Sequence, residues 1–211
     1  MRKALIALLL CFSLVLSVFA DTAGPSGGST FAQAADGNDS WTSLANLGAE
    51  DAATANCDLS NAGLSNTLQI TGFGFSVSGT INGITVEIKR QGFGSTTAKD
   101  SSIRLLIGGV ASGTDKASAS SWPNASLQYA TYGGAADTWG LSPTNTQINA
   151  SDFGVAIVVQ DPDLNAIARI DYVRITVTYT PAASGNPRGG DFFFSSPVSQ
   201  TREAGRLGVA Q

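Results

Sequence analysis

The residues best suited to chemistry in this chain are aromatic, amide and carboxylate side chains that gather between positions 122 and 139. Indole and phenol rings stack on the C–H faces of sugars, while neighbouring polar groups bind the hydroxyls. The pattern predicts a carbohydrate-binding loop built from Trp122, Asn124, Tyr129, Tyr132, Asp137 and Trp139. The alternative is that both tryptophans fill the ends of a β-sandwich, since large aromatic residues are commonly buried.

Two acidic turns offer oxygen ligands at alternate positions, which suits a hard cation such as calcium. The first turn holds Asp36, Asn38 and Asp39, and the second holds Asp161 and Asp163. Neither has the twelve-residue spacing and terminal Glu of an EF-hand. Because Asp and Asn side chains often cap the backbone of their own turns, capping is the alternative to calcium binding. Calcium is the one cofactor that the sequence suggests.

Signatures of catalysis are weak. The chain has no His, the only side chain whose unperturbed pKa lies near neutrality, which excludes His-based triads and most zinc sites. Paired carboxylates can hydrolyse glycosides, but most acids here stand beside Gly, Pro, Ser or Asn, where acids act as turn caps. We therefore expect a protein that is not an enzyme.

The charge balance argues against nucleic acid as a partner. There are 16 acidic and 12 basic residues, giving a net charge of −4, so no basic field attracts a phosphate backbone. Only 13% of the residues are charged, against about 25% in an average soluble domain. Gly, Ser, Thr, Asn and Ala make up the difference, as is typical of short strands joined by many turns.

Residues 1–20 have the order of a secretory signal peptide. Arg2 and Lys3 precede an apolar run over 4–18, and Val18-Phe19-Ala20 stands before a cleavage point at Asp21. The run is too short for a membrane-spanning helix of about 20 residues. We therefore expect a secreted or cell-surface protein with no membrane span after cleavage.

Cleavage would leave Cys57 as the only cysteine. A lone thiol in a secreted chain suggests either a small buried hydrophobic residue or an intermolecular disulfide. No disulfide within the chain is then expected.

Period-two alternation of apolar and polar residues is the strongest structural signal from position 68 onward. No stretch of ten or more residues after the signal peptide has a helical period, so crossover helices and parallel sheets are not expected. The pattern predicts an all-β fold, an antiparallel two-sheet β-sandwich of jelly-roll-like form over residues 41–180. The predicted strands are 68–77 and 81–89, paired through a turn at Ser78-Gly79, then 102–107, 127–132, 147–148, a central strand at 153–160, and 167–180.

The two flanks of this domain are predicted to be irregular. Residues 21–40 are rich in Gly, Ser and Ala and suggest a flexible leader, and residues 181–211 suggest a linker and an irregular tail. The tail contains Phe192, Phe193 and Phe194, which favour burial on the same domain or on a partner.

Four segments, in this order, resemble a loosely defined β-sandwich domain of tailed-phage virion proteins and secreted bacterial surface proteins. They are SGTINGITVEIKR (78–90), TYGGAADTWG (131–140), INASDFGVAIVV (148–159) and IARIDYVRITVTY (167–179). The resemblance implies a structural or adhesive domain with no catalytic residues to carry over. A signal peptide departs from virion proteins, which assemble in the cytoplasm, and favours a surface protein.

These observations favour a non-enzymatic, secreted structural or surface-assembly protein. Its subunits would join through β-sandwich edges and extended tails, because an unpaired edge strand can accept an extended segment from a neighbour. The leader and the Phe192–Phe194 segment are suitable donors, and the partner would be another copy or another surface protein. The alternative is an adhesive module that binds a glycan or a surface, which solvent-exposed Trp122 and Trp139 would favour.

Overall fold

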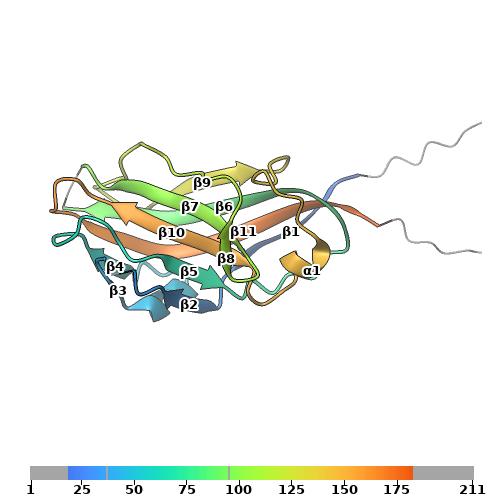
Figure 1. Ribbon diagram of the computed structural model, residues 1–211, viewed down its shortest axis with the longest axis horizontal. Coiled ribbons are helices and arrows are strands. Elements are labelled where there is room, and N and C mark those ends of the chain that lie inside the picture. The colour runs from blue at the N-terminus through green and yellow to red at the C-terminus, as the bar shows by residue number, and fades with distance from the viewer. Residues whose placement is uncertain (1–18, 37, 95, 183–211) are drawn as a thin grey trace, which may run out of the picture.

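Two antiparallel sheets packed face to face form a jelly-roll-like β-sandwich in the computed structural model (Figure 1). The structure describes residues 19–36, 38–94 and 96–182. The predicted all-β, two-sheet fold is therefore confirmed. Residues 1–18 of the signal peptide and the Phe192–Phe194 segment lie outside the described residues. Within the described ranges, no helix has the length and apolar character that a membrane crossing requires.

Sheet A and sheet B, as we name them, share the strands of the chain almost evenly. The order in sheet A is β3 (Trp41–Thr42), β4 (Ala55–Asp58), β11 (Ile167–Pro181), β6 (Gly79–Phe93) and β9 (Gln128–Gly134), with β1 (Asp21–Gly27) also paired to β11. The order in sheet B is β2 (Thr30–Gln33), β5 (Leu68–Thr71), β10 (Gly154–Gln160), β7 (Lys99–Ile107) and β8 (Val110–Ser112). Two short helices, η1 (Leu44–Gly48) and α1 (Asn145–Ile148), complete the described part.

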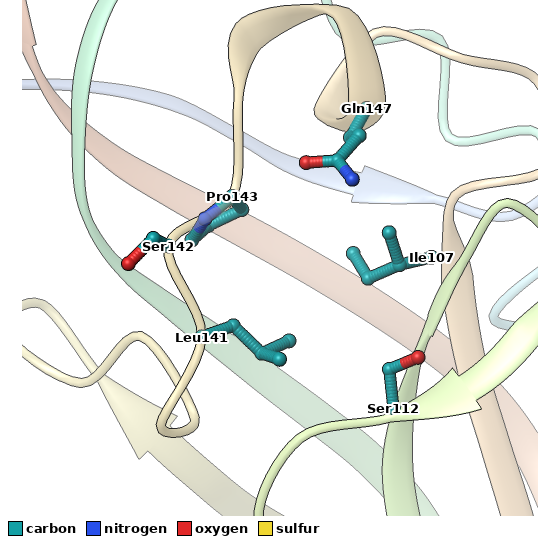
Figure 2. Close-up of a pocket in the computed structure, with 6 residues that line it drawn as sticks. All are labelled: Ile107, Ser112, Leu141, Ser142, Pro143 and Gln147. Carbon is teal, nitrogen blue, oxygen red and sulfur yellow. The ribbon is translucent and has the colours of Figure 1, made fainter.

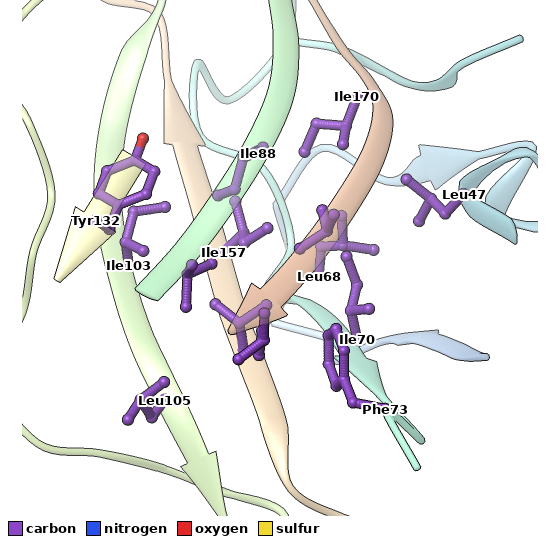
Figure 3. Packing of buried hydrophobic residues seen from close by; sticks show 14 of the residues in the cluster. Leu47, Leu68, Ile70, Phe73, Ile88, Ile103, Leu105, Tyr132, Ile157 and Ile170 are labelled. Carbon is purple, nitrogen blue, oxygen red and sulfur yellow. The ribbon is translucent and has the colours of Figure 1, made fainter. Parts of the chain in front are cut away.

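The core lies between the two sheets and follows the predicted alternation. In β11, Val173, Ile175 and Val177 are buried while Arg174 and Thr176 are partly exposed between them. The predicted central strand is β10, which pairs with β5 on one side and β7 on the other. Figure 3 shows apolar side chains of both sheets meeting in this layer. Burying each such aliphatic side chain stabilises the fold by about 1.5–3 kcal/mol.

The predicted flexible leader is wrong, because residues 21–33 contain strands of both sheets. β1 pairs with β11 from Asp21 opposite Tyr179 to Gly27 opposite Arg174, and β2 pairs with β5. A Cβ atom on Gly27 would lie 2.0 Å from the Tyr172 hydroxyl oxygen, so a small residue is needed there. A strand can pair through its backbone groups without alternating apolar and polar side chains. The Gly-, Ser- and Ala-rich composition of residues 21–33 therefore did not indicate these strands.

Two local predictions also differ from the structure. The strand predicted over 68–77 ends at Thr71, where Gly72 and Gly74 adopt positive φ values of 74° and 68°. β5 therefore belongs to sheet B and β6 to sheet A, and the two do not form the predicted hairpin. The strand predicted at 147–148 is instead the end of α1, a short helix that begins with a capping box between Thr144 and Gln147.

Candidate functional site

The candidate site is the open edge of sheet A along β9. Among the described residues, the other strands at the ends of the two sheets are short: β3 has two residues, β8 three and β2 four. β1 and β9 each have seven residues. β1 is interrupted by Pro25 and by a register shift between Ala23 and Ser26. β9 thus has the longest edge without proline or register shift in the described part of the chain, although Gly133 near its end has a positive φ of 69°.

β9 lacks the features that natural edge strands use against pairing with another chain. Such edges are usually short, charged, bulged or interrupted by proline. β9 has the sequence QYATYGG, with no charged residue and no proline. Its ladder with β6 runs from Gln128 opposite Arg90 to Gly134 opposite Ile84 without a register shift. This edge can therefore accept a further antiparallel strand.

The direction of the backbone groups of β9 follows from those of β6. Ile84 N–H donates to Asp137 and Gly92 N–H donates to Pro123, and both acceptors lie on the chain that flanks β9. Because N–H groups alternate sides along a strand, the even-numbered residues of β6 face β9. The odd-numbered residues of β9 at 129 and 131 therefore direct their backbone N–H and C=O groups away from β6. The alternation ends at Gly133, whose φ is 69°.

The chain before β9 bonds to both sheets, and within the described ranges its backbone hydrogen bonds are to residues other than those of β9. Lys116 N–H donates to the Ile103 carbonyl at 2.9 Å, and Trp122 N–H donates to the Ala98 carbonyl at 2.7 Å. The chain after β9 folds back on its own end, where Asp137 N–H donates to the Gly134 carbonyl at 3.1 Å. Among the described residues, neither flank therefore forms a backbone hydrogen bond with residues 129–133 of β9.

A buried polar network holds β9 from the inside. The Tyr132 hydroxyl donates to Asp100 Oδ2 at 2.9 Å and accepts a hydrogen bond from Arg90, which also pairs with Asp100. Trp122 Nε1 donates to Asp100 Oδ1 at 2.7 Å, and Ser118 N–H donates to Oδ2 at 2.9 Å. Since Asp100 lies on β7, the network joins the edge of sheet A to sheet B.

The electrostatics of this network depend on its exclusion from water. Arg90, Asp100, Tyr132 and Trp122 are each no more than 5% exposed. The Arg90 guanidinium carbon lies 4.7 Å from the centre of the Trp122 ring and 5.5 Å from that of Tyr132. Burial raises the pKa of Tyr132, so its hydroxyl stays protonated and can donate to the carboxylate. Losing one partner of such a buried ion pair costs about 3–5 kcal/mol.

Trp139 fixes the far end of β9. Its indole is fully buried, and Nε1 donates to the Ile84 carbonyl at 2.9 Å. A Cβ atom on Gly133 would lie 2.5 Å from Nε1, and Gly133 has a φ of 69°. Asp137 accepts from Trp139 N–H at 2.8 Å and pairs with Lys116 at 2.7 Å, and this cation lowers the pKa of the carboxyl.

The outer face of sheet A beside β9 carries charges that are already paired. Arg174 binds both carboxylate oxygens of Glu87, at 2.8 and 3.1 Å, and its guanidinium carbon lies 4.3 Å from the centre of the Tyr129 ring. Lys89 pairs with Glu50 at 3.0 Å. Burial raises the pKa of Tyr129 to about 12, so the ring stays neutral at physiological pH.

The six residues predicted to bind a sugar do lie around β9, but three of the four aromatic ones turn inward, and the fourth, Tyr129, is partly buried under Arg174 on the outer face. Trp139 is 0% exposed and Trp122 is 2% exposed, so neither offers a ring face to a ligand. Tyr132 is also buried, whereas Asn124 is exposed and its backbone carbonyl accepts from the side chain of Gln91 at 2.9 Å. The alternative interpretation, tryptophans that fill the sandwich, is the one that matches the structure.

The first acidic turn uses its carboxylates to hold neighbouring backbone. Asp36 Oδ2 accepts from the Thr67 N–H at 2.8 Å and from its hydroxyl at 2.6 Å, and these hydrogen bonds lower the pKa of Asp36. Asp39 Oδ2 accepts from the N–H groups of Ala62 and Gly63, at 3.0 and 3.1 Å. The geometry favours capping over calcium binding.

The second acidic turn is built in the same way. Asp161 is fully buried and accepts from the Thr97 hydroxyl at 2.6 Å and from Ala166 N–H at 2.7 Å. Burial alone would raise the pKa of Asp161, but hydrogen bonds from Thr97 and from its own turn outweigh this and lower it. Asp163 is exposed, and Asn38 N–H donates to the side chain of Asn66. The described residues contain no group of three or more His, Cys, Asp or Glu placed to hold a metal ion.

Cys57 is a buried core residue, as one of the two interpretations of its sequence position predicted. Burial raises the pKa of its thiol to about 12. The thiol is therefore neither exposed nor ionised, and the structure disfavours the intermolecular disulfide.

Sequence reasoning missed one further feature, a pair of cavities on either side of the loop 141–143. The larger has a volume of about 350 Å³ and the smaller about 110 Å³. Leu141, Ser142 and Pro143 line both. The residues that line them come from separate parts of the chain and include both apolar and polar side chains. No local sequence signal therefore marks these cavities.

Comparisons with protein-family models, with curated proteins and with solved structures found no match to this chain. The sandwich agrees with the fold that the four resembling segments imply. Membership of that family stays a prediction.

Proposed function

We propose that this chain is a non-enzymatic structural protein of a secreted or cell-surface assembly, and that two copies join through their β9 edges. The two strands would run antiparallel about a two-fold axis, which makes both copies use the same surface. Sheet A would then continue from one copy into the other. The observation that carries the proposal is the unprotected, seven-residue ladder edge of β9.

The way β9 is anchored supports this role. A strand that serves as a template for another chain must keep its backbone groups in register, and Tyr132 and Trp139 secure the C-terminal part of β9 from inside. A buried ion pair such as Arg90–Asp100 contributes little net stability compared with apolar packing. Its use beside β9 is explained better by a need for fixed strand geometry.

The charge distribution also permits two β9 edges to meet. β9 contains no charged side chain, so like charges do not face each other across the proposed junction. On the adjoining face, Glu87 is paired with Arg174 and Glu50 with Lys89. Repulsion between the two copies is therefore low near the contact, although each chain carries a net charge of −4.

The acidic side chains that would serve an enzyme are engaged in structural contacts, which supports a non-enzymatic role. Asp39 and Asp161 hold backbone N–H groups, and Asp100 lies in the buried network. The adhesive alternative would need ring faces in water, and Trp122 and Trp139 do not supply them. We therefore propose assembly in preference to glycan binding.

Sedimentation and light scattering of the secreted form test the proposal. The parent chain should form dimers at micromolar concentration, and Thr131→Lys should weaken the association about tenfold or more by placing a charge on each facing edge. Thr22→Lys is the matched control, because Thr22 is an exposed threonine on β1 at the opposite side of the same sheet. A monomeric parent, or equal effects of both substitutions, would overturn the proposal.

A further inference from the structure

The two cavities around the loop 141–143 share Leu141, Ser142 and Pro143 and form a groove with apolar and polar walls at one end of the sandwich. The larger is lined by Gly79, Thr80, Ile81, Thr138, Leu141, Ser142 and Pro143. The smaller is lined by Ile107, Ser112, Leu141, Ser142, Pro143 and Gln147. Figure 2 shows Ile107 and Leu141 reaching into the space between β7 and the loop. We call the two together the end groove.

The described chain ends beside this groove. The last residue of β11, Pro181, pairs with Gly79, and Ala182 N–H donates to the Ser78 carbonyl at 3.2 Å. Gly79 is itself part of the wall of the larger cavity. In Figure 1, β11 ends at the same end of the molecule as α1, whose Gln147 lines the smaller cavity. The chain beyond residue 182 thus starts next to the strand pair of Pro181 and Gly79, and Gly79 lines the groove.

We propose that the Phe192–Phe194 segment of the same chain occupies the end groove. Residues 183–191 separate it from Ala182. A linker of that length spans up to about 30 Å when extended, and its Gly, Ser and Asn content gives an average span of about 15–18 Å. The groove lies well inside that radius. A tether this short gives an effective concentration in the millimolar range, which favours the chain's own segment over that of a second copy.

The chemistry of the groove suits phenyl rings. Ile81, Leu141, Pro143 and Ile107 supply apolar surface, and the larger cavity falls within the range of about 300–1,000 Å³ that is usual for ligand pockets. Ser112, Ser142 and Gln147 stand at the polar rim, where they can bind the backbone of an extended segment. Three consecutive phenylalanines are the most apolar part of the chain beyond β11, and burial removes them from water.

Disulfide trapping tests the proposal in the full chain. Thr138→Cys on the groove is combined with Ser195→Cys next to the three rings, with Cys11→Ser to remove the second cysteine of the sequence. Cys57 does not compete, because it is buried and its pKa is raised to about 12. The control pair is Thr176→Cys with Ser195→Cys, since Thr176 is a half-buried threonine on the outer face of β11, a few residues from the same exit point.

The groove pair should form a disulfide within one chain about tenfold faster than the control pair, measured by mass and by non-reducing gels. Replacing Phe192, Phe193 and Phe194 by Ser should abolish that difference. Equal rates for the two pairs would overturn the proposal, and so would disulfides that form only between chains. Adding Thr131→Lys to every variant and working at low protein concentration weakens assembly through β9, so the outcome does not depend on the proposed function.

Discussion

β1 and β9 are both seven-residue strands on sheet A, yet their exposed edges differ in chemistry. β1 pairs only with β11 and contains Asp21, Pro25 and a register shift between Ala23 and Ser26. β9 pairs only with β6 and contains neither charge, nor proline, nor register shift. The comparison shows that the residues of an edge strand, rather than its position or length, decide whether another chain can pair with it.

The two strands also differ in how they are held. β1 lies against β11 through small residues, and Gly27 leaves room for the Tyr172 hydroxyl. β9 reaches across the sandwich through Tyr132 to Asp100 on β7. A loosely anchored strand can tolerate interruption, whereas a strand that presents a regular edge needs fixed points. The contrast therefore predicts that disturbing the anchors of β9 changes both stability and association.

The largest effect should come from Asp100→Leu. The substitution leaves the buried Arg90 guanidinium without its carboxylate and removes the acceptor of Trp122 Nε1. We expect the free energy of unfolding, measured in urea, to fall by about 3–5 kcal/mol. The control is Glu87→Gln on the partly exposed outer face, which should cost about 1 kcal/mol or less. Equal losses would mean that the network does not anchor β9.

A smaller effect is expected where β9 ends. Gly133→Ala places a Cβ atom 2.3 Å from the Ile84 carbonyl oxygen at a φ of 69°, so it should cost about 1–3 kcal/mol. Gly134→Ala is the matched control, since nothing lies within 4 Å of its Cβ position. Thermal unfolding of both variants measures the difference. If the control lost as much stability, the end of β9 would not be fixed by Trp139.

The smallest effect should be that of pH on association. β9 carries no Asp, Glu, Lys or Arg, and the raised pKa of Tyr129, about 12, keeps that ring neutral far above pH 7. The chain also has no His. The dimer constant should therefore stay within about twofold between about pH 6 and 9, measured by sedimentation. A marked change of the dimer constant in that pH range would mean that a titrating group lies at the contact between the two β9 strands.

Acid should weaken the fold itself before it changes the β9 edge. The pKa values of Asp36 and Asp161 are lowered in the folded chain by hydrogen bonds from neighbouring groups. Their contribution to stability is present above the unfolded pKa of about 4 and is lost as the pH falls through the folded value. A free energy of unfolding that rose as the pH fell below about 4 would contradict this assignment.

Local patterning predicted the strands that build the core, because period-two alternation is read directly from residues such as those of β10 and β11. It did not predict β1 and β2, since their place in the sheets comes from backbone pairing with β11 and β5. It also left open whether Trp122 and Trp139 face water. The burial of a ring depends on contacts with distant residues, here Asp100 and Ile84.

The candidate site was only half predictable for the same reason. A strand over 127–132 follows from the sequence, and the structure has β9 there. That β9 is the last strand of sheet A follows from the order of all the strands, which no single segment encodes. The significance of its missing charge and proline became visible only beside β1, where both are present.

Amide hydrogen exchange of residues 21–211 at two protein concentrations tests the central claim most directly. The amides of Tyr129 and Thr131 point away from β6, so a second β9 should protect them as the concentration rises from nanomolar to micromolar. Ala23 and Ser26 on β1 provide the internal comparison and should exchange at unchanged rates. Protection of Tyr129 and Thr131 that does not vary with concentration would contradict assembly through the β9 edge.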